Sequence, residues 1–335
     1  MVNKFSKVFV LLVVFVGATS VLSATDAVYT DRKDVQDFIA SMVSEHGFQG
    51  EEVRSLLASA ERKQSILDAI SRPAERTLEW RDYRKIFLTS DRIAGGVAFW
   101  QDNSEALTRA EQTYGVGAEY IVAIIGVETR YGKHMGKYRV LDALATLGFD
   151  YPPRSTFFRK ELTQYLLMTR EEGMDPKAQL GSYAGAMGFG QFISSSFRAY
   201  AVDFNGDGRR DILRNKTDAI GSVANYFKRH GWRGDEQVIV PVALQDPAAS
   251  ELANQGEALQ HTVGSLRARG VVVPCADDAA KAALFRMESA AGTQYWVGLN
   301  DFYAITRYNH SSMYALAVHQ LAQAIVLGRA ERVAN

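Results

Sequence analysis

Residues 123–132, AIIGVETRYG, place one ionisable carboxyl in an apolar segment. If this segment is helical, Glu128 shares a stripe with Ile124 and Ile125. Burial disfavours the charged form of a carboxyl and raises its pKa, so a Glu on such a stripe can hold a proton near neutral pH and give it to a leaving group. The alternative is a structural Glu at the edge of the core, paired with a cation such as Arg130.

The bulk composition is that of an ordinary folded protein. The chain has 335 residues, of which 47% are hydrophobic and 23% charged, and 38 Lys and Arg residues balance 38 Asp and Glu residues. This length allows two or three domains with sizeable cores. A net charge of zero gives no field that would gather nucleic acid or an anionic membrane. We therefore expect no nucleic-acid partner, and a local groove for any polymer that the protein binds.

The N-terminal residues have the layout of a secretory signal peptide. Lys4 and Lys7 precede an apolar run at 8–16, which gives way to small residues. A cut is expected after Ser20 or Ser23. A retained membrane anchor is the alternative, but the apolar run is shorter than the ~20 residues that a spanning helix needs. We therefore expect an exported protein that is soluble after cleavage.

Cys275 is the single cysteine of the sequence. The core must therefore be stable without an internal disulfide. Because no cysteine stands near the predicted cut, a lipid anchor on a new N-terminal cysteine is excluded. Cys275 follows VVVP in a strand-like run with no nearby His, so we expect a buried, inert thiol rather than a nucleophile.

Helical periodicity dominates most of the chain. Apolar residues recur at helical spacing in the segments 35–43, 53–60, 80–87, 90–114, 158–166, 220–227 and 313–321. We expect segment 90–114 to be one long amphipathic element capped at Ser90 and Asp91. We also expect Thr217 to cap the helix that Gly231 closes.

Between Trp232 and Asn300 the sequence changes to short β-prone runs separated by polar or small residues. These runs are QVIVPVAL, RGVVVP, LFRMES and YWVGL. They predict a small strand-containing lobe, after which the chain returns to the helical body. The predicted organisation is a signal peptide at 1–23, a helical N-terminal domain at 25–80, a helical core at 81–232, a β-containing lobe at 233–299 and a C-terminal return at 300–335.

A glycine-rich segment at 181–192, GSYAGAMGFGQF, is a second candidate for a functional wall. Glycine lets a ligand approach the backbone closely, and Gln191 offers both a donor and an acceptor. A tight structural turn is the alternative. The segment lacks the GK[ST] ending of a phosphate-binding loop.

A third candidate is an oxygen-rich turn at 203–211, DFNGDGRRD. Oxygen-bearing side chains occupy alternate positions, at Asp203, Asn205 and Asp207. With Gly208 next, this matches the first six positions of a calcium loop. The usual twelfth-position Glu is Arg214 here, so the missing ligand would have to come from Asp218. The alternative is an Asx-rich surface turn without a metal.

The sequence gives little indication of metallohydrolase, serine-hydrolase or thiol redox chemistry. No HExxH, GxSxG or CxxC motif occurs, and no histidines are spaced for zinc. Aromatic residues outside the clear helical stripes are candidates for stacking on sugar rings. They are Tyr83, Tyr226, Tyr303 and Tyr308.

Four motifs, in this order, closely resemble the lytic murein transglycosylase B family: IIGVETRYG, GSYAGAMGFGQF, AVDFNGDG and DAIGSVANYFKRHGW. The likeness runs from about Asp31 to RYNHSSMYALAV near the C-terminus. It implies a mainly α fold with a lysozyme-like helical core, a helical N-terminal domain and a small β-containing lobe. It also implies a periplasmic enzyme that cuts the β-1,4 bond between N-acetylmuramic acid and N-acetylglucosamine in peptidoglycan and leaves a 1,6-anhydro end.

Carried over to matching positions, Glu128 is the family's sole catalytic carboxylate. The resemblance implies that it protonates the glycosidic oxygen and then takes the proton from the sugar's own 6-hydroxyl, which attacks the anomeric carbon in place of water. One group that must be acid and then base needs a pKa near the working pH. Ordinary glycosidases use two carboxylates about 5 to 9.5 Å apart, and no second acid is paired with Glu128 in the local sequence.

The resemblance also assigns groove and metal residues. The implied substrate-binding residues are Gln191, Phe192, Ser182, Tyr226, Tyr83, Arg154, Tyr303 and Tyr308. The implied calcium ligands are Asp203, Asn205, Asp207, the carbonyl of Arg209, and Asp218. Pro153 departs from the family pattern, because relatives often have two adjacent arginines at 153 and 154. The calcium is expected to act chiefly as a structural clip.

Two alternatives stay open at this point. One is a muramidase on the same scaffold, which would hydrolyse the bond with water. The other is a non-catalytic wall-binding module in which Glu128 is structural. In each case the expected partner is the peptidoglycan glycan strand, and other cell-wall enzymes are candidate protein partners.

Overall fold

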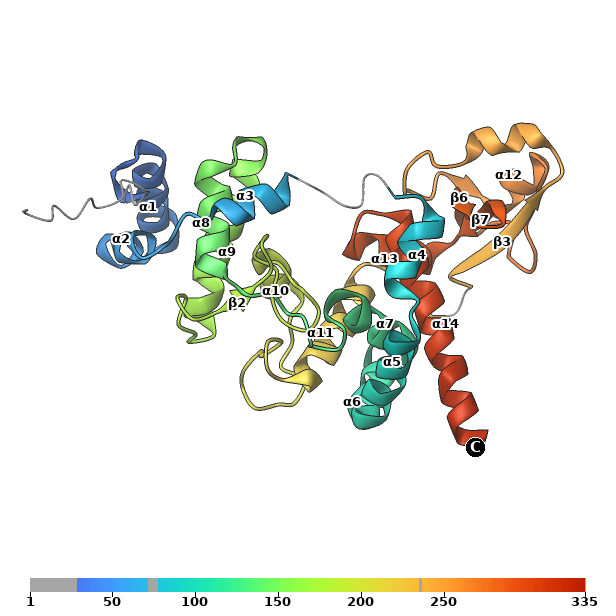
Figure 1. The fold of residues 1–335 in the computed structure, drawn as a ribbon, viewed down its shortest axis with the longest axis horizontal. Helices are drawn as coiled ribbons and strands as arrows, with labels where there is room; N and C mark the ends of the chain where they lie inside the picture. Colours follow the sequence, from blue (N-terminus) through green and yellow to red (C-terminus); the bar gives the residue numbers. More distant parts are fainter. Residues whose placement is uncertain (1–28, 72–77, 235–236, 335) are drawn as a thin grey trace, which may run out of the picture.

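The computed structural model describes residues 29–71, 78–234 and 237–334, and the predicted signal peptide lies outside them. Helices dominate this part of the chain and a small sheet lobe accompanies them (Figure 1), which confirms the mainly α prediction. The α-helices are α1 Lys33–His46, α2 Gly50–Ala58, α3 Gln64–Ile70, α4 Trp80–Phe87, α5 Ser90–Asp102, α6 Ser104–Tyr114, α7 Ala118–Thr129, α8 Val140–Asp150, α9 Ser155–Glu171, α10 Ser194–Tyr200, α11 Lys216–Arg229, α12 Val263–Ala268, α13 Asn300–Tyr308 and α14 Ser312–Ala334. The 3-10 helices are η1 Tyr29–Asp31, η3 Pro152–Arg154 and η4 Pro247–Leu252, and the strands are β1 Tyr138–Arg139, β2 Leu180–Gly181, β3 Ile239–Leu244, β4 His261–Thr262, β5 Val271–Val272, β6 Lys281–Ser289 and β7 Gly292–Gly298.

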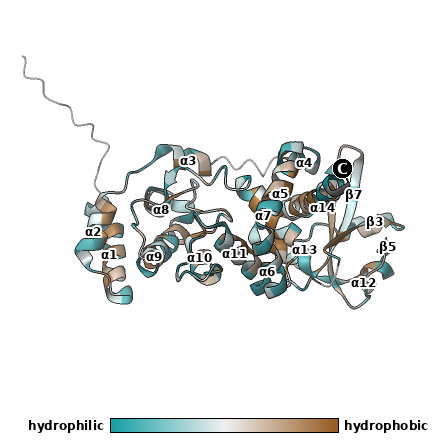
Figure 2. Cartoon of the chain, turned by 90° about the horizontal axis from the view of Figure 1, so that it is seen from below, coloured by the Kyte–Doolittle hydropathy of each residue, from teal (hydrophilic) through white to brown (hydrophobic). Residues whose placement is uncertain are grey.

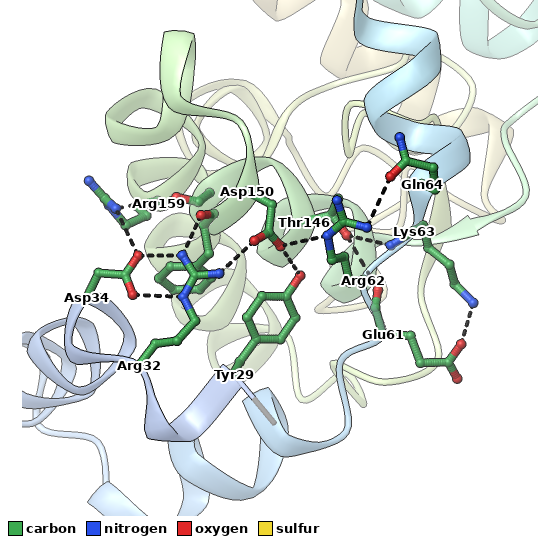
Figure 3. A network of polar contacts seen from close by, with 12 residues as sticks. Tyr29, Arg32, Asp34, Glu61, Arg62, Lys63, Gln64, Thr146, Asp150 and Arg159 are labelled. Atoms are coloured by element: carbon green, nitrogen blue, oxygen red, sulfur yellow. Dashed lines mark hydrogen bonds and ion pairs between the residues drawn. The ribbon is translucent and has the colours of Figure 1, made fainter. Parts of the chain in front are cut away.

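At one end of the molecule in Figure 1, α1 packs against α9, α3 packs against α8, and α2 packs against α1. Asp150, at the end of α8, accepts hydrogen bonds from the Tyr29 hydroxyl at 2.8 Å and from Arg32 Nη1 at 2.6 Å (Figure 3). Arg32 Nη2 also donates to the Phe149 carbonyl oxygen at 2.6 Å. Charge-assisted hydrogen bonds of this kind are stronger than neutral ones, so they fix the N-terminal helices on α8. The predicted domain boundaries stay predictions.

Helix α7 lies at the centre of the helical body, in contact with α5, α6, α11 and α14. Every residue of α7 except Glu119 and Glu128 is buried. The helix is therefore apolar all round, as expected for a helix inside a core, rather than apolar on one stripe. Figure 2 shows apolar residues concentrated where α5, α7 and α14 come together.

Three predictions about helix ends are wrong. Segment 90–114 is divided into α5 and α6 at Asn103, whose Nδ2 donates to the Phe99 carbonyl oxygen at 2.7 Å, and Thr89 caps α5. Helix α11 is capped by Asn215, whose Oδ1 accepts the Thr217 backbone N–H at 2.9 Å. In each case an Asn or Thr side chain satisfies a backbone group at the helix end, and several such residues stand close together in the sequence.

The predicted lobe contains a five-stranded antiparallel sheet in the order β4-β6-β7-β3-β5. Helix α12 contacts β4 and β5, and its Val263 and Leu266 share an apolar cluster with Val240 and Val297. Cys275 is exposed, so the expectation of a buried thiol is wrong. Strand β5 ends at Val272, and the chain has left the sheet before it reaches the cysteine.

In the described ranges, no helix combines the length and the apolar character that crossing a bilayer requires.

Candidate active site

Glu128 lies in the last turn of α7, where it is partly exposed. The helix ends at Thr129, and the backbone of Arg130 and Tyr131 is left-handed, with φ of 49° and 62°. The Thr129 hydroxyl lies 3.0 Å from the Phe189 carbonyl oxygen, so the end of α7 is tied to the glycine-rich segment. The Glu128 carboxyl thus stands at the end of a helix that the core holds in place.

Tyr314 of α14 is a site residue that the sequence patterns do not indicate. Its hydroxyl donates a 2.5 Å hydrogen bond to Glu128 Oε1, and the residue is 2% exposed. Burial, and then the charge of Glu128, raise the pKa of Tyr314 well above its ordinary value, and the same causes raise the pKa of Tyr308. Both hydroxyls therefore keep their protons at neutral pH and act as donors. One feature of the sequence could have indicated Tyr314: it is a tyrosine within a buried helical stripe. A buried tyrosine hydroxyl needs a hydrogen-bond partner.

The glycine-rich segment 181–192 meets this site near its C-terminal end. The Tyr308 hydroxyl donates a 2.6 Å hydrogen bond to the Gly190 carbonyl oxygen. Gln191 has a left-handed backbone with φ of 49°, and its Nε2 donates to the Gly188 carbonyl oxygen at 3.0 Å. A left-handed Gln is uncommon and costs free energy, and such outliers cluster at functional sites. The segment is therefore a shaped wall rather than a loose connector.

Three of the predicted groove residues form one aromatic cluster. The ring centroid of Phe192 lies 5.8 Å from that of Tyr226 and 6.0 Å from that of Tyr308, and the two tyrosine rings are 4.7 Å apart. Phe192 and Tyr226 are 3% and 7% exposed, whereas Tyr308 is partly exposed. The rings therefore cover one another, and they build a wall rather than open faces for stacking.

Ser182 and Tyr83 have structural contacts as well. Ser182 Oγ accepts the backbone N–H groups of Ala184 at 3.3 Å and Ala186 at 3.1 Å, which closes a turn in the glycine-rich segment. Tyr83 is 1% exposed on α4. It lies near Tyr314, because the negative charge of an ionised Tyr83 raises the pKa of Tyr314.

Arg154 and Tyr303 contact neighbours along the chain. The Arg154 guanidinium is exposed at η3 and lies 4.3 Å from the ring centroid of Phe157. Tyr303 is partly exposed on α13, with the Arg307 guanidinium 4.4 Å from its ring centroid. A role toward substrate stays a prediction for both residues.

The predicted calcium loop is closed by its own backbone. The Asp203 carboxylate accepts N–H groups of Gly206 and Gly208, both at 2.7 Å. Asp218 is fully buried and its Oδ1 accepts the N–H of Asn205 at 3.1 Å. Burial raises the pKa of Asp218 above its ordinary value. Backbone hydrogen bonds from the loop oppose this shift but are the smaller effect.

The donors of this loop suit calcium, but they do not form a closed cage. Side-chain oxygens at Asp203, Asn205 and Asp207 alternate along a loop whose Gly206 and Gly208 have φ of 80° and 87°, the sharp turn that a calcium loop requires. Among the described residues, no three His, Cys, Asp or Glu side chains are grouped so that they could hold a metal ion.

The comparisons with known proteins agree on one family. The model of the transglycosylase SLT domain matches residues 30–323. Membrane-bound lytic murein transglycosylase B of Escherichia coli is 46% identical over 314 residues, which cover 90% of this chain and 85% of that protein.

Solved structures give the same result. The catenated lytic transglycosylase SltB1 of Pseudomonas aeruginosa has 53% sequence identity and a TM-score of 0.87, with 90% of this chain and 99% of that chain covered. The Escherichia coli lytic transglycosylase Slt35 in complex with calcium has 46% identity and a TM-score of 0.82, with 90% and 95% covered. The chain therefore belongs to the transglycosylase SLT family of lytic murein transglycosylases, which are lyases that act on peptidoglycan.

Proposed function

We propose that Glu128 performs both proton transfers of the cleavage. Its acid form donates a proton to the glycosidic oxygen as the bond between that oxygen and C1 of N-acetylmuramic acid breaks. The resulting carboxylate takes the proton of the 6-hydroxyl of the same sugar, and the 6-oxygen bonds to C1. The products are a 1,6-anhydro-N-acetylmuramic acid end and a free 4-hydroxyl on N-acetylglucosamine. No water is consumed, and Glu128 regains its proton.

The hydrogen bond from Tyr314 to Glu128 is the observation that carries this proposal. It fixes Oε1, so the proton would travel on Oε2. A catalytic group must stand within about 3 Å of the atom it protonates, and a carboxyl at a helix end needs such a support to keep that position. Gln191, Phe192, Tyr226 and Tyr308 would form the adjoining groove wall.

The product ends distinguish this chemistry from hydrolysis. Isolated glycan strands are digested with the purified enzyme, and the new ends are analysed by mass. We expect 1,6-anhydro ends. A product heavier by one water, with a reducing N-acetylmuramic acid, would overturn the proposal in favour of a muramidase.

The substitution Glu128→Gln tests the catalytic role directly. It keeps the shape of the side chain and removes the acid, so we expect turnover of glycan strands to fall by about 100-fold to 10,000-fold. Glu119→Gln is the matched control, because Glu119 is the other residue of α7 that is not buried. The control should retain turnover. Undiminished clearance of cell walls by Glu128→Gln would exclude Glu128 as the catalyst.

We also propose that Ca2+ binds the loop that begins at Asp203. Support comes from the alternating oxygen donors, from the left-handed glycines between them, and from the calcium complex of the Escherichia coli relative. The proposed ligands are Asp203, Asn205, Asp207, the carbonyl oxygen of Arg209, and Asp218. When bound, the ion would supply positive charge that neutralises these carboxylates and clips the loop to the start of α11.

Export to the periplasm is the third proposal. The layout of residues 1–23 supports it, with Lys4 and Lys7 ahead of an apolar run. We expect the mature protein to begin after Ser20 or Ser23 and to be recovered in the soluble exported fraction. N-terminal sequencing of that protein checks both points, and an intact N-terminus in a membrane fraction would count against them.

A further inference from the structure

The chain reverses direction directly after the proposed catalytic residue, and the reversal is strained. Arg130, Tyr131 and Gly132 follow one another with φ of 49°, 62° and 90°. Left-handed backbone is unfavourable for residues with a side chain, so two such residues in succession persist only where the surroundings fix them. Something near the end of α7 must therefore hold this turn.

The ring of Tyr131 fills a slot that is lined by three glycines. A Cβ added to Gly126 of α7 would lie 2.5 Å from the Tyr131 hydroxyl oxygen. A Cβ added to Gly95 or Gly96 of α5 would lie 2.9 Å or 2.6 Å from atoms of the same side chain. Real Cβ contacts are not this short, so only glycine at these positions leaves room for the ring.

The slot is closed by specific contacts at both ends of the side chain. The Tyr131 hydroxyl donates a 2.8 Å hydrogen bond to the Arg92 carbonyl oxygen on α5. The ring centroid lies 5.6 Å from that of Phe99. On the backbone, the Tyr131 N–H donates to the Ile125 carbonyl oxygen at 3.3 Å, which satisfies a group at the open end of α7.

We propose that Tyr131, seated between Gly95, Gly96 and Gly126, is the positioning residue that sets where Glu128 stands. Glu128 lies three residues before Tyr131, in the last turn of α7, and the chain reversal at Arg130 and Tyr131 ends that helix. Helix ends fray unless they are tied down, and a displacement of about 1 Å of a reacting group can cost about 100-fold in rate. The inference rests on the proposed role of Glu128 as catalyst.

Substitutions on both sides of the contact test the proposal. We expect Tyr131→Leu to lower kcat for glycan strands by about 10-fold to 100-fold with KM changed by less than about 2-fold, because substrate contacts remain. Gly126→Ala should have the same effect, since the new methyl group displaces the ring. The double variant should lose no more than either single one, because both act through one contact. Tyr131→Phe keeps the ring in the slot and should recover most of the rate.

Controls separate positioning from a general loss of stability. Gly148→Ala, in helix α8, is the matched glycine control, since a Cβ there would lie 3.2 Å from Arg159 Cγ and should leave kcat unchanged. Gly95→Ala, with its longer contact of 2.9 Å, serves as the milder variant if Gly126→Ala does not fold.

The outcomes distinguish failure of this inference from failure of the proposed function. Tyr131→Leu and Gly126→Ala with wild-type kcat and a lowered Tm would make Tyr131 purely structural and overturn the inference. Glu128→Gln is measured in the same assay. If that variant loses turnover while the slot variants keep theirs, only the inference fails. If Glu128→Gln retains turnover, the proposed function fails.

Discussion

At the scale of single residues, removal of the Tyr314 hydroxyl is a small structural change that tests whether this group orients Glu128. Tyr314→Phe deletes the hydrogen bond to Glu128 Oε1 and keeps the ring in its buried place. We expect kcat to fall by about 10-fold to 100-fold, because the carboxyl loses the contact that orients it. Steady-state turnover of glycan strands measures the effect, and circular dichroism checks the fold.

Tyr29→Phe is the matched control for this substitution. It too removes a tyrosine hydroxyl that donates to a carboxylate, here Asp150 at 2.8 Å, but in the network of the N-terminal helices. Both variants should lose about 1 kcal/mol of stability, and only Tyr314→Phe should lose turnover. Equal kcat values in the two variants would refute a role for Tyr314 in orienting Glu128.

The difference between Glu128 and Tyr314 shows what the sequence can predict at this scale. A carboxyl inside an apolar run is visible locally, because burial of a charge is costly whatever the fold. The partner of Glu128 is 186 residues away, and only the packing of α14 on α7 brings the two together. Family motifs pointed to the segment that contains Tyr314, but the helical pattern alone suggests an ordinary core residue.

At the scale of elements, the loop at 203–211 should couple calcium to stability. Removing the ion leaves the carboxylates near Asp203 uncompensated, so we expect chelation to lower Tm by about 3 to 8 °C while activity in the cold changes less. Calorimetry with and without a chelator measures this shift. No shift in protein that is shown to be metal-free at the end would contradict the site.

A pair of variants assigns that effect to the loop. Asp203→Ala should abolish the dependence of Tm on calcium. Asp175→Ala removes a similar turn, in which Oδ1 accepts the Lys177 N–H at 2.8 Å, and should leave the dependence intact. Loss of calcium dependence in both variants, or in neither, would place the ion elsewhere.

Element boundaries were the least predictable part of the secondary structure. Periodicity finds helices and not their ends, because competing caps stand within a few residues of one another. Asn215 rather than Thr217 caps α11, and Asn103 interrupts a pattern that reads as one helix. The prediction that Cys275 is buried is wrong for a related reason. The run of valines before it does not indicate where pairing with the neighbouring strand stops.

At the scale of the whole molecule, we expect His319 to make stability depend on pH. It lies on α14, with Nδ1 2.9 Å from the hydroxyl oxygen of Tyr120 on α7, and burial lowers its pKa from 6.5 to about 4. Between these values the unfolded chain takes up a proton that the folded protein does not. The free energy of unfolding should therefore fall by up to about 3 kcal/mol as the pH drops from about 6.5 to about 4, and the loss should then level off.

Urea unfolding across this pH range checks the prediction. His319→Gln cannot take up the proton, so its unfolding free energy should lack this component of the pH dependence. His134→Gln, at an exposed histidine, is the control and should behave as the wild type does. Parallel pH curves for the wild type and His319→Gln would show that His319 is not responsible.

The fold class followed from the sequence, whereas the arrangement of its parts did not. Helical runs followed by β-prone runs predict a helical body with a strand-containing lobe, and the structure has both. Nothing in the pattern says that α3 packs on α8 while α4 packs on α14. Such pairings depend on shape complementarity between distant surfaces, which local periodicity does not encode.

The link between Glu128 and Tyr314 also sets an order of completion during synthesis. Because 186 residues separate the two, a chain that emerges from its N-terminus has made Glu128 and the whole sheet lobe before Tyr314 exists. An interrupted chain, or one trimmed ahead of α14, would carry the acid without the hydroxyl that orients it. With Glu128 as the proposed catalyst and Tyr314 as its proposed support, the enzyme would reach full activity only after its last helix is in place.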